Sequence, residues 1–596
     1  MRLVHQIKVA AAEALLQLYQ QELKPEDILV NATKPEFTGD YTIVLFAMVK
    51  SLKTSPDALG QALGSHLVSR HPELFQSFNI IKGFLNLEIP DSYWQQFVMS
   101  QYAQSDFGIQ PKNSQRVMVE YSSPNTNKPL HLGHLRNNFL GSSLSAILKA
   151  TGNEVIKTCI VNDRGIHICK SMIAWQRFAN GATPASTQTK GDHFVGNYYV
   201  LFNNALQAEI AAAVASGQTK EQAEKEVPIM KAAQEMLLEW EKGNPEVLEL
   251  WKTMNEWVYA GFAQTYQLIG SEFDKTYYES NTYLLGKNLV QQGLEKKVFY
   301  QKPDGSVWID LTADGLDEKL VQRSDGTSVY ITQDIGLAEQ KQAEFNTSQS
   351  IYVVGDEQNY HFKVLKLICE HLQLPSAEGI YHLSYGMVEL PTGKMKSREG
   401  TVVDADDLVD NMIRIAAEKT AELGKVNDFT AAELQALNEM IGIGALKFFL
   451  LRVDPKKKML FNPEESIDFH GFTGPFIQYT HARIKSILRK TGTAAEQVSE
   501  ADAPIEAWLP EERELATTLE TFPTVLEEAA LQQDPSQLAI YTYQVAKTFN
   551  SLYAAHSIAG AATTQLKIRR LQLAELTAHV IKTSMQLLGI AVPERM

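Results

Sequence analysis

Cysteine is scarce in this sequence, and several other common features are missing from it. The 596 residues include 3 cysteines, Cys159, Cys169 and Cys369. Their odd number and their spacing fit neither a disulfide framework nor a zinc site, so we expect reduced thiols in a cytoplasmic protein without a structural metal. No apolar run approaches the length of a membrane span, and the N-terminus lacks a signal-peptide pattern, so we expect no membrane partner. We found no internal repeat and no low-complexity segment.

The net charge of −15 argues against indiscriminate binding of nucleic acids, which usually requires an electropositive surface. The charge is unevenly distributed, however. Acidic residues are concentrated between positions 496 and 534, whereas cations gather at 483–490 and again at 567–570. An acidic protein with such local basic tracks is compatible with the binding of one particular RNA.

The chain is too long for a single hydrophobic core, and its hydrophobic patterns divide it into four parts. These parts are 1–112, 113–405, 406–477 and 478–596. The first combines helices with FNIIKGFLNLEI, whose alternation predicts strand, and a turn followed by a helix at 34–52. The second alternates strands and helices around a helix-rich insertion at about 180–285. The third and fourth are predicted to be helical, a linker followed by a bundle.

The second part contains several segments that are predicted to form strands of one parallel sheet. VMVEY, NEVIKTCIV, VFYQKPDGSVWIDLT, VYITQDIG and IYVVGDEQ are short apolar segments separated by polar loops and helical patterns. Two runs of strand and helix on either side of an insertion predict a Rossmann-like doubly wound parallel sheet. Ligands are expected at the carboxyl ends of its strands.

The segment SSPNTNKPLHLGHLRNNFLG (122–141) lies between a predicted strand and a predicted helix. His131 and His134 fall near the first helical turn, where free N–H groups and the helix dipole favour a phosphate. Gly133 between them leaves room for a base or a sugar to approach the backbone. The segment therefore predicts a nucleotide site.

A second segment, LPTGKMKSREGTVVDADDL (390–408), places Lys394, Lys396 and Arg398 in a loop next to glycine. Alternating cations suit pyrophosphate, whose charge grows as it leaves the α-phosphorus. Such a loop on its own is more often a solvated surface. Together with the upstream histidines, it favours phosphate chemistry.

These two segments resemble the HIGH and KMSKS signatures of class I aminoacyl-tRNA synthetases. The second resemblance is imperfect, because Ser397 occupies the fourth position, where the family has lysine, and Arg398 occupies the fifth. It leaves open whether Lys396 or Arg398 is the second cation on the pyrophosphate.

The whole chain resembles arginyl-tRNA synthetases, through VEYSSPNTNKPLHLGHLRN, RSDGTSVYITQDIG, YVVGDEQNYHF, FIQYTHARI and the closing LLGIAVPERM. This resemblance implies ATP-dependent activation of L-arginine to arginyl-adenylate and its transfer to the terminal ribose of tRNA(Arg). It also implies Mg²⁺ with the ATP, a requirement for tRNA during activation, a monomer, an N-terminal module on the tRNA elbow and a C-terminal anticodon-binding domain.

The resemblance also assigns residues to the substrates. A guanidinium needs carboxylate acceptors, and Tyr330 and Asp334 share a helical face while Glu120 ends a strand. Residues implied to bind arginine are Glu120, Ser123, Asn125, His134, Tyr330, Asp334 and Gln358. Residues implied to bind ATP are His131, Gly133, His134, Lys394, Lys396, Ser397 and Arg398, of which His131, His134 and Lys394 are catalytic. Residues implied to contact tRNA are Tyr41, Lys456, Lys457, Lys458, Tyr479 and Arg483.

Alternative interpretations stay open on the residues alone. Glu120 could be a structural partner of Arg136. The chain could be a small-molecule nucleotidyltransferase, although the large helical C-terminal part argues against it. It could also be a class I synthetase for lysine, or an RNA-binding paralogue with a weakened active site.

Overall fold

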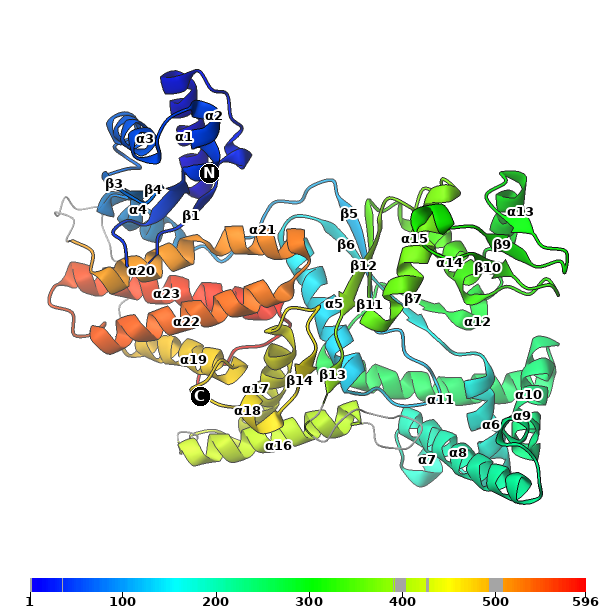
Figure 1. Ribbon diagram of the computed structural model, residues 1–596. Helices are drawn as coiled ribbons and strands as arrows, with labels where there is room; N and C mark the ends of the chain where they lie inside the picture. The colour runs from blue at the N-terminus through cyan, green and yellow to red at the C-terminus, as the bar shows by residue number, and fades with distance from the viewer. Residues whose placement is uncertain (1–2, 35, 390, 392–402, 425–427, 492–506) are drawn as a thin grey trace.

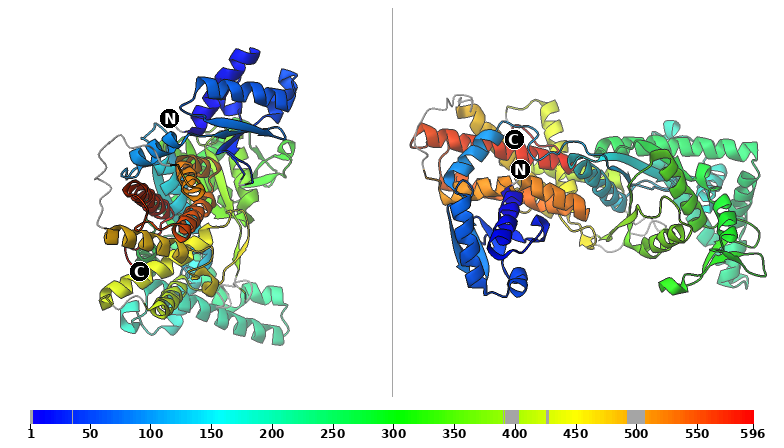
Figure 2. Two further views of the ribbon diagram at one scale, coloured as in Figure 1. Left: turned by 90° about the vertical axis from the view of Figure 1, so that its left-hand side faces the viewer. Right: turned by 90° about the horizontal axis from the view of Figure 1, so that it is seen from above.

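The computed structural model describes residues 3–34, 36–389, 391, 403–424, 428–491 and 507–596. The molecule is elongated, with the N-terminal module and the C-terminal helices at one end and the insertion helices at the other (Figure 1). Seen from above, the N-terminal module projects from the C-terminal helices (Figure 2). The parallel sheet lies between these two ends.

The N-terminal module packs helices against a four-stranded antiparallel sheet of order β1-β2-β4-β3. Its elements are α1 (Leu3–Tyr19), β1 (Val30–Ala32), β2 (Tyr41–Val44), α2 (Phe46–Leu52), α3 (Pro56–Arg70), β3 (Ser77–Ile81), β4 (Phe84–Glu88) and α4 (Asp91–Gln101). The hairpin of β3 and β4 confirms the strand predicted from FNIIKGFLNLEI. The prediction of a turn and a helix at 34–52 is incomplete, because β2 precedes α2. Its partner β4 lies about 40 residues further along the chain, where a local pattern does not show it.

The central sheet confirms the predicted doubly wound architecture. It has five strands in the order β12-β11-β5-β6-β7, and every neighbouring pair is parallel. The strands are β5 (Arg116–Glu120), β6 (Glu154–Val161), β7 (Lys275–Tyr278), β11 (Gln349–Gly355) and β12 (Ile380–Tyr385). The chain winds in one direction from β5 to β7 and in the other from β11 to β12. The switch point therefore lies between β5 and β11, where ligands of such sheets bind.

Helices and a small second sheet connect these strands. The elements are α5 (Leu132–Ala150), α6 (Ile166–Phe178), α12 (Glu279–Thr282), α13 (Lys287–Glu295), β8 (Tyr300–Gln301), β9 (Val307–Ile309), β10 (Lys319–Gln322), α14 (Tyr330–Phe345) and α15 (Asn359–His371). Strands β8, β9 and β10 form an antiparallel sheet of their own, so VFYQKPDGSVWIDLT contributes strands but none to the central sheet.

The strand expected from VYITQDIG is wrong, because these residues form the first turns of α14. Ile331 and Ile335 are both buried and lie four residues apart, which is the spacing of one helical face. A short apolar segment of this kind does not distinguish strand from helix by its pattern alone.

The insertion lies in the connection between β6 and β7. Its helices are α7 (Pro184–Thr187), α8 (Gly191–Ala215), α9 (Lys220–Glu226), α10 (Pro228–Glu241) and α11 (Pro245–Ile269). The expected range of 180–285 extends too far, because it includes β7, which is a strand of the central sheet. Strand β7 is short and follows a long helix directly, so its signal is weak.

The C-terminal part is helical. Its elements are β13 (Val388–Glu389), α16 (Ala405–Leu423), α17 (Ala431–Leu451), β14 (Met459–Leu460), α18 (Pro463–Ser466), α19 (Gly474–Thr491), α20 (Pro510–Glu520), α21 (Phe522–Gln532), α22 (Pro535–Ala555) and α23 (Thr564–Leu587). Among the described residues, α17 alone has the length and composition of a membrane span, and 67% of its apolar window is buried inside the protein. It is packed as the core helix of a soluble protein is.

Candidate active site and RNA-binding surfaces

His131 and His134 lie at the N-terminus of α5, next to the switch point of the sheet. His131 Nδ1 accepts a hydrogen bond of 3.1 Å from the Gly133 N–H, and His134 Nδ1 accepts one of 3.1 Å from the His131 N–H. The ring centroids are 3.9 Å apart. The two imidazoles thus form a reciprocal capping box, and the backbone of the first helical turn holds both rings in place.

Both imidazoles are neutral, and each carries its ring hydrogen on Nε2. Burial lowers the pKa of His131 to about 3 and lowers the pKa of His134 well below its ordinary value. The charge of Lys128 acts in the same direction. Since each Nδ1 accepts a backbone N–H, the ring hydrogen of each neutral imidazole lies on Nε2. The site therefore offers two Nε2–H donors at a helix N-terminus, an arrangement suited to phosphate oxygens.

The ring of His131 leaves little room for a side chain at the glycine between the histidines. A Cβ atom added at Gly133 would lie 3.0 Å from Cε1 and 3.2 Å from Nδ1 of His131. A side chain at this position would therefore require the His131 ring to shift slightly. This steric reason adds to the expected need for space around a bound nucleotide.

The turn between β5 and the histidines is strained and tied to the neighbouring strand. Ser122 and Ser123 have φ values of 83° and 38°, which non-glycine residues rarely adopt. The Ser122 N–H donates to Asn137 Oδ1 at 2.6 Å, and Asn137 Nδ2 donates to the Val353 carbonyl of β11 at 2.7 Å. Such strain persists only where the surroundings impose it, and it clusters at functional sites.

Other residues expected to hold the amino-acid backbone surround this turn. Ser123 is half-buried, whereas Asn125 and Gln358 are exposed. Asn125 pairs with Asn162 in a parallel bridge, and Gln358 follows β11 directly before α15. All three therefore lie beyond the carboxyl ends of β5 and β11, close to the switch point.

Glu120 lies at the end of β5, but its charge is already compensated. It is 6% exposed and forms a buried ion pair with Lys341 of α14, which is 2% exposed. Thr158 Oγ1 also donates to Glu120 at 3.4 Å. Arg136, the alternative structural partner, binds main-chain carbonyls instead. In this structure Lys341 and Thr158 therefore bind the Glu120 carboxylate, at the strand end where a guanidinium contact is expected.

Tyr330 and Asp334 lie on the first turns of α14 and differ in their surroundings. Tyr330 is 74% exposed. The Asp334 carboxylate lies 2.6 Å from His361 Nε2 of α15, and its side chain is 40% exposed. Asp334 therefore presents an accessible negative charge that is held by one histidine.

Two acidic residues beside this site were not selected from the sequence. Asp163 is 1% exposed, and its carboxylate accepts from Ser280 N–H at 2.8 Å and from the Tyr259 hydroxyl at 2.9 Å. Glu279 lines a cleft of about 610 Å³ together with Tyr330. Burial, with the negative charges of Asp163 and Asp334, raises the pKa of Glu279 to about 7. Glu279 directly follows β7, so the same strand-end rule that selected Glu120 would have found it had β7 been predicted.

Lys394, Lys396, Ser397 and Arg398 lie outside the described residues, but both flanks of their segment are described. Strand β13 ends at Glu389. On the other side, the Leu132 N–H donates to the Val403 carbonyl at 3.2 Å, and the Ala405 N–H donates to the Leu130 carbonyl at 3.0 Å. His131 and Asp404 form an antiparallel bridge. Residues 403–405 of the second segment are therefore paired with the backbone around the first histidine.

One acid-rich cluster lies just beyond this pairing. Asp192, His193 and Asp406 bring possible ligand atoms within 4.8 Å of one another. Lys190 Nζ, however, lies 2.6 Å from Asp406 and 3.2 Å from Asp192. The cluster is an ion-pair network that joins α8 of the insertion to the start of α16.

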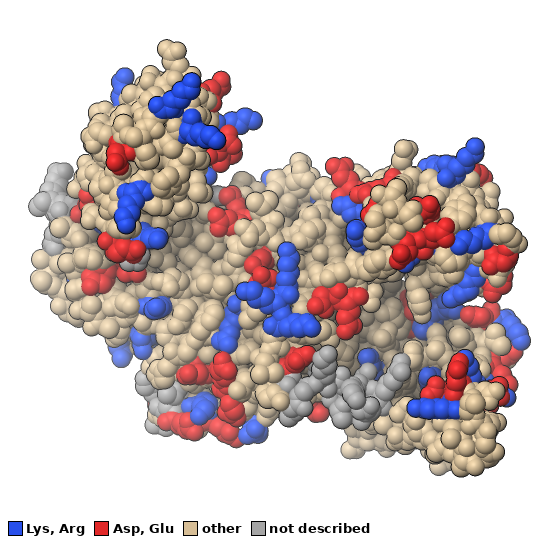
Figure 3. Space-filling model, viewed as in Figure 1, with Lys and Arg blue, Asp and Glu red and all other residues tan. Residues whose placement is uncertain are grey.

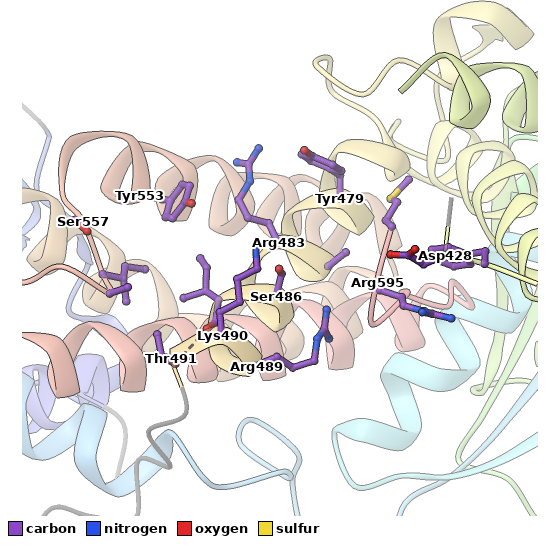
Figure 4. A pocket seen from close by; sticks show the side chains of 16 residues that line it. Asp428, Tyr479, Arg483, Ser486, Arg489, Lys490, Thr491, Tyr553, Ser557 and Arg595 are labelled. Atoms are coloured by element: carbon purple, nitrogen blue, oxygen red, sulfur yellow. Dashed lines mark hydrogen bonds between the residues drawn. The ribbon is translucent and has the colours of Figure 1, made fainter. Parts of the chain in front are cut away.

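A second cleft, of about 720 Å³, lies in the C-terminal helices between α19 and α22 (Figure 4). Cations and aromatic rings line it together. The Arg483 guanidinium lies 4.9 Å from the ring centroid of Tyr479 and 5.6 Å from that of Tyr553. Arg489, Lys490 and Arg595 also line the cleft, as do Phe429 and Met596. Rings that can stack on bases beside cations that can bind phosphates are typical of single-stranded RNA sites.

Tyr41 does not present a surface to RNA in this structure. It is 1% exposed, and its hydroxyl donates to Glu520 Oε2 of α20 at 2.6 Å. The neighbouring Asp40 lies 3.0 Å from Arg513 of the same helix. The Gly-Asp-Tyr segment therefore faces the C-terminal helices and joins the two modules, and the contact of Tyr41 with tRNA stays a prediction.

Lys456, Lys457 and Lys458 are exposed, as expected for contacts with an RNA backbone. They form a turn between α17 and β14. Lys and Arg side chains gather near the middle of the molecular face shown in Figure 3. This face therefore carries a local group of basic side chains despite the net negative charge.

Activation of a carboxylate with ATP and its transfer to a folded RNA require a phosphate site and a distant RNA-binding surface on one chain. This fold offers a candidate for each, in the arrangement of the class I aminoacyl-tRNA synthetases.

Family models match almost the whole chain. The catalytic domain of "tRNA synthetases class I (R)" matches residues 96–462, the "DALR anticodon binding domain" matches 477–596, and the "Arginyl tRNA synthetase N terminal domain" matches 5–89. The chain belongs to the arginyl-tRNA synthetase family.

Individual relatives agree with this assignment. The arginine–tRNA ligases of Parabacteroides distasonis and Amoebophilus asiaticus are each 51% identical to this chain, over 596 and 591 residues, and 99% of every chain is covered. The solved arginyl-tRNA synthetase of Thermus thermophilus has a TM-score of 0.81 at 26% identity and covers 99% of both chains. That of Plasmodium falciparum shares the fold, with a TM-score of 0.79 at 18% identity and coverage of 99% and 98%.

These comparisons identify the reaction as the ATP-dependent joining of L-arginine to tRNA, with release of AMP and pyrophosphate. Neither a lysine enzyme nor a weakened RNA-binding paralogue is favoured, because identity to arginine–tRNA ligases is high over the full length.

Proposed function

We propose that His131 and His134 bind the phosphates of Mg²⁺–ATP through their Nε2–H groups. Lys394, together with Lys396 or Arg398, then holds the departing pyrophosphate. The observation that carries this proposal is the capped histidine pair at the N-terminus of α5, whose backbone also pairs with residues 403–405, which follow the second signature. Pre-placed donors of this kind stabilise charge that develops during the reaction.

In the first step, a carboxylate oxygen of arginine attacks the α-phosphorus of ATP, and the bond to pyrophosphate breaks. Arginyl-adenylate forms without a protein nucleophile, so the enzyme acts by positioning and electrostatics. In the second step, the 2′-hydroxyl of the terminal ribose of tRNA(Arg) attacks the arginyl carbonyl carbon, and AMP leaves.

The guanidinium of arginine is recognised by Asp334, Tyr330 and Glu120 in this proposal. Because Lys341 compensates Glu120, Asp334 supplies the main accessible charge of the three. Glu279, which shares a cleft with Tyr330, adds a further acceptor. The amino-acid backbone is held by Ser123, Asn125, His134 and Gln358.

The tRNA occupies a longer surface. The C-terminal cleft with Tyr479 and Arg483 receives unstacked bases, and Lys456–Lys458 contact the sugar–phosphate backbone. We expect the enzyme to act as a cytoplasmic monomer. Its proposed domains are 1–112 on the tRNA elbow, 113–405 for catalysis, 406–477 as a linker and 478–596 on the anticodon.

Pyrophosphate exchange with each amino acid, run with and without tRNA, tests this proposal. We expect exchange with arginine alone, and only when tRNA is present. Exchange with lysine but not with arginine would contradict the substrate assignment. Strong exchange with arginine in the absence of tRNA would contradict only the dependence on tRNA.

A further inference from the structure

Arg136 is a fully buried arginine on α5, two residues after His134. Its guanidinium donates to main-chain carbonyls from two other segments. Nη1 donates to Gly386 O at 2.6 Å, and Nη2 donates to Lys457 O at 3.0 Å and to Pro455 O at 3.2 Å, with Asp454 O at 3.5 Å. Within the described part of the chain, the guanidinium has no carboxylate at ion-pair distance.

Burying the charged guanidinium of Arg136 costs desolvation free energy. Burial lowers the pKa of Arg136 to about 10, so the side chain is still charged at neutral pH. A buried charge is strongly disfavoured unless hydrogen bonds replace its water. Here those bonds come only from main-chain carbonyls of low charge. An apolar residue would pack α5 at a lower desolvation cost, so the guanidinium is explained better by the segments that it orders.

The two segments that Arg136 joins are themselves paired. The Gly386 N–H donates to the Pro455 carbonyl at 2.9 Å, and the Met459 N–H donates to the Met387 carbonyl at 3.1 Å. Strands β13 and β14 continue this pairing in parallel. The contact between Gly386 and the 454–457 turn is close, because a Cβ atom at Gly386 would lie 2.6 Å from the Lys457 carbonyl carbon.

Each segment leads to a different functional element. Strand β13 ends at Glu389, five residues before Lys394 of the second signature. The 454–457 turn carries on its exposed side the lysines proposed to contact the tRNA backbone. Arg136 itself lies on the helix that begins with the histidine pair. In Figure 1, β13 and β14 lie beside α5, and α5 and β13 are in contact.

We propose that Arg136 is a positioning residue that connects tRNA on the lysine turn to both signatures of the active site. Phosphates bound by Lys456–Lys458 fix the turn, and the turn carbonyls fix the guanidinium of Arg136. The same carbonyls and the pairing of β14 with β13 set the point from which the second signature starts. This inference rests on the proposed role of the lysines and of tRNA in arginine activation. It identifies Arg136 as the residue that connects the lysine turn to the active site.

The first test replaces Arg136 by lysine, which keeps the charge but loses the planar fork that reaches two segments at once. In the folded variant, the tRNA-dependent exchange kcat should fall by at least about tenfold, because small misplacements at the reacting centre have large effects. The Kd for tRNA, measured by filter binding, should stay within about threefold, since Arg136 does not touch RNA. Arg569→Lys is the matched control. Arg569 is 4% exposed and pairs with Glu512 at 3.1 Å in the C-terminal helices. Arg569→Lys should lower the melting temperature without lowering the exchange kcat.

The second test uses surface residues, so it holds even if the Arg136 variant does not fold. The triple variant Lys456→Ser, Lys457→Ser, Lys458→Ser should bind tRNA more weakly, and its exchange kcat should also fall at saturating tRNA. Combined with Arg136→Lys, the triple variant should lower kcat by less than the product of the separate effects, because both act through one connection.

Three results would overturn the inference. These are a folded Arg136→Lys variant with wild-type exchange, a triple variant that changes only the Kd for tRNA, or separate effects on kcat that multiply in the combined variant. The wild-type protein alone tests the proposed tRNA dependence of arginine activation, on which the inference rests. A wild type that exchanges arginine equally well without tRNA removes the tRNA dependence itself, whatever the variants do.

Discussion

Tyr41→Phe distinguishes a joint between modules from a contact with tRNA. The Tyr41 hydroxyl donates to Glu520 Oε2 at 2.6 Å, and the two side chains are 1% and 7% exposed. A hydrogen bond to a charged group contributes about 1.5–3 kcal/mol. Glu520 keeps the Leu3 N–H, which donates to its other oxygen at 3.1 Å. We therefore expect the substitution to destabilise the joined modules by about 2 kcal/mol.

Calorimetric unfolding measures this loss. In a cooperative unit of about 150–250 residues, 1 kcal/mol shifts the melting temperature by about 2–4 °C, so the transition that includes the N-terminal module should fall by roughly 4–8 °C. The KM for tRNA, measured well below that transition, should change by less than about twofold, because the hydroxyl is buried. Tyr19→Phe in the same module is the control, since no hydrogen bond of the Tyr19 hydroxyl is found among the described residues. An unchanged transition together with a clearly raised KM for tRNA would refute this reasoning and restore Tyr41 as an RNA contact.

Three further predictions concern charge at other buried or half-buried positions. Asp334→Asn should reduce kcat/KM for arginine by roughly 30-fold or more, equivalent to about 2–4 kcal/mol, while the KM for ATP changes little; equal losses for both substrates in exchange kinetics would show that Asp334 is structural. Lys447 is 7% exposed, donates to the Gly589 carbonyl at 2.6 Å, and burial lowers its pKa to about 8. Lys447→Met should therefore raise the free energy of unfolding at pH 7 by about 1–2 kcal/mol, and urea denaturation that shows a loss instead would contradict this. His131 has a pKa lowered to about 3, below its unfolded value, so its contribution to stability is complete above about pH 6.5 and is lost as the pH falls towards 3. Between pH 7 and pH 5, His131→Gln should flatten the decline in unfolding free energy by at most about 2 kcal/mol, and an identical decline in both proteins would show that the imidazole is not held neutral.

Local sequence patterns predicted the secondary structure correctly where a single segment contains a clear apolar run or a helix cap. The strands β5, β6 and β11 are apolar runs between polar loops, and α5 begins at a recognisable capping position. The order of strand and helix then implies the doubly wound sheet, whose strand ends lie together by geometry. For this reason His131, Gly133 and His134 could be placed at a helix N-terminus beside the switch point before any tertiary contact was known.

The same patterns failed where a distant partner decides the structure. VYITQDIG has a short apolar run, and it is a helix because Ile331 and Ile335 face the same core. Strand β7 is short, and its place in the sheet depends on pairing with β6. Missing β7 also hid Glu279, whose position at a strand end is visible only once that strand is known.

The sequence alone determined the class of fold and the family and located the proposed phosphate site, because these depend on residue types at fixed spacing along a single segment. Only the tertiary structure decided which polar groups face one another. It pairs Glu120 with Lys341, Tyr41 with Glu520, and Arg136 with carbonyls about 250 and 320 residues away in the chain. A buried charge or hydroxyl takes whichever partner the packing of remote segments brings within hydrogen-bond distance, and no local spacing encodes that choice.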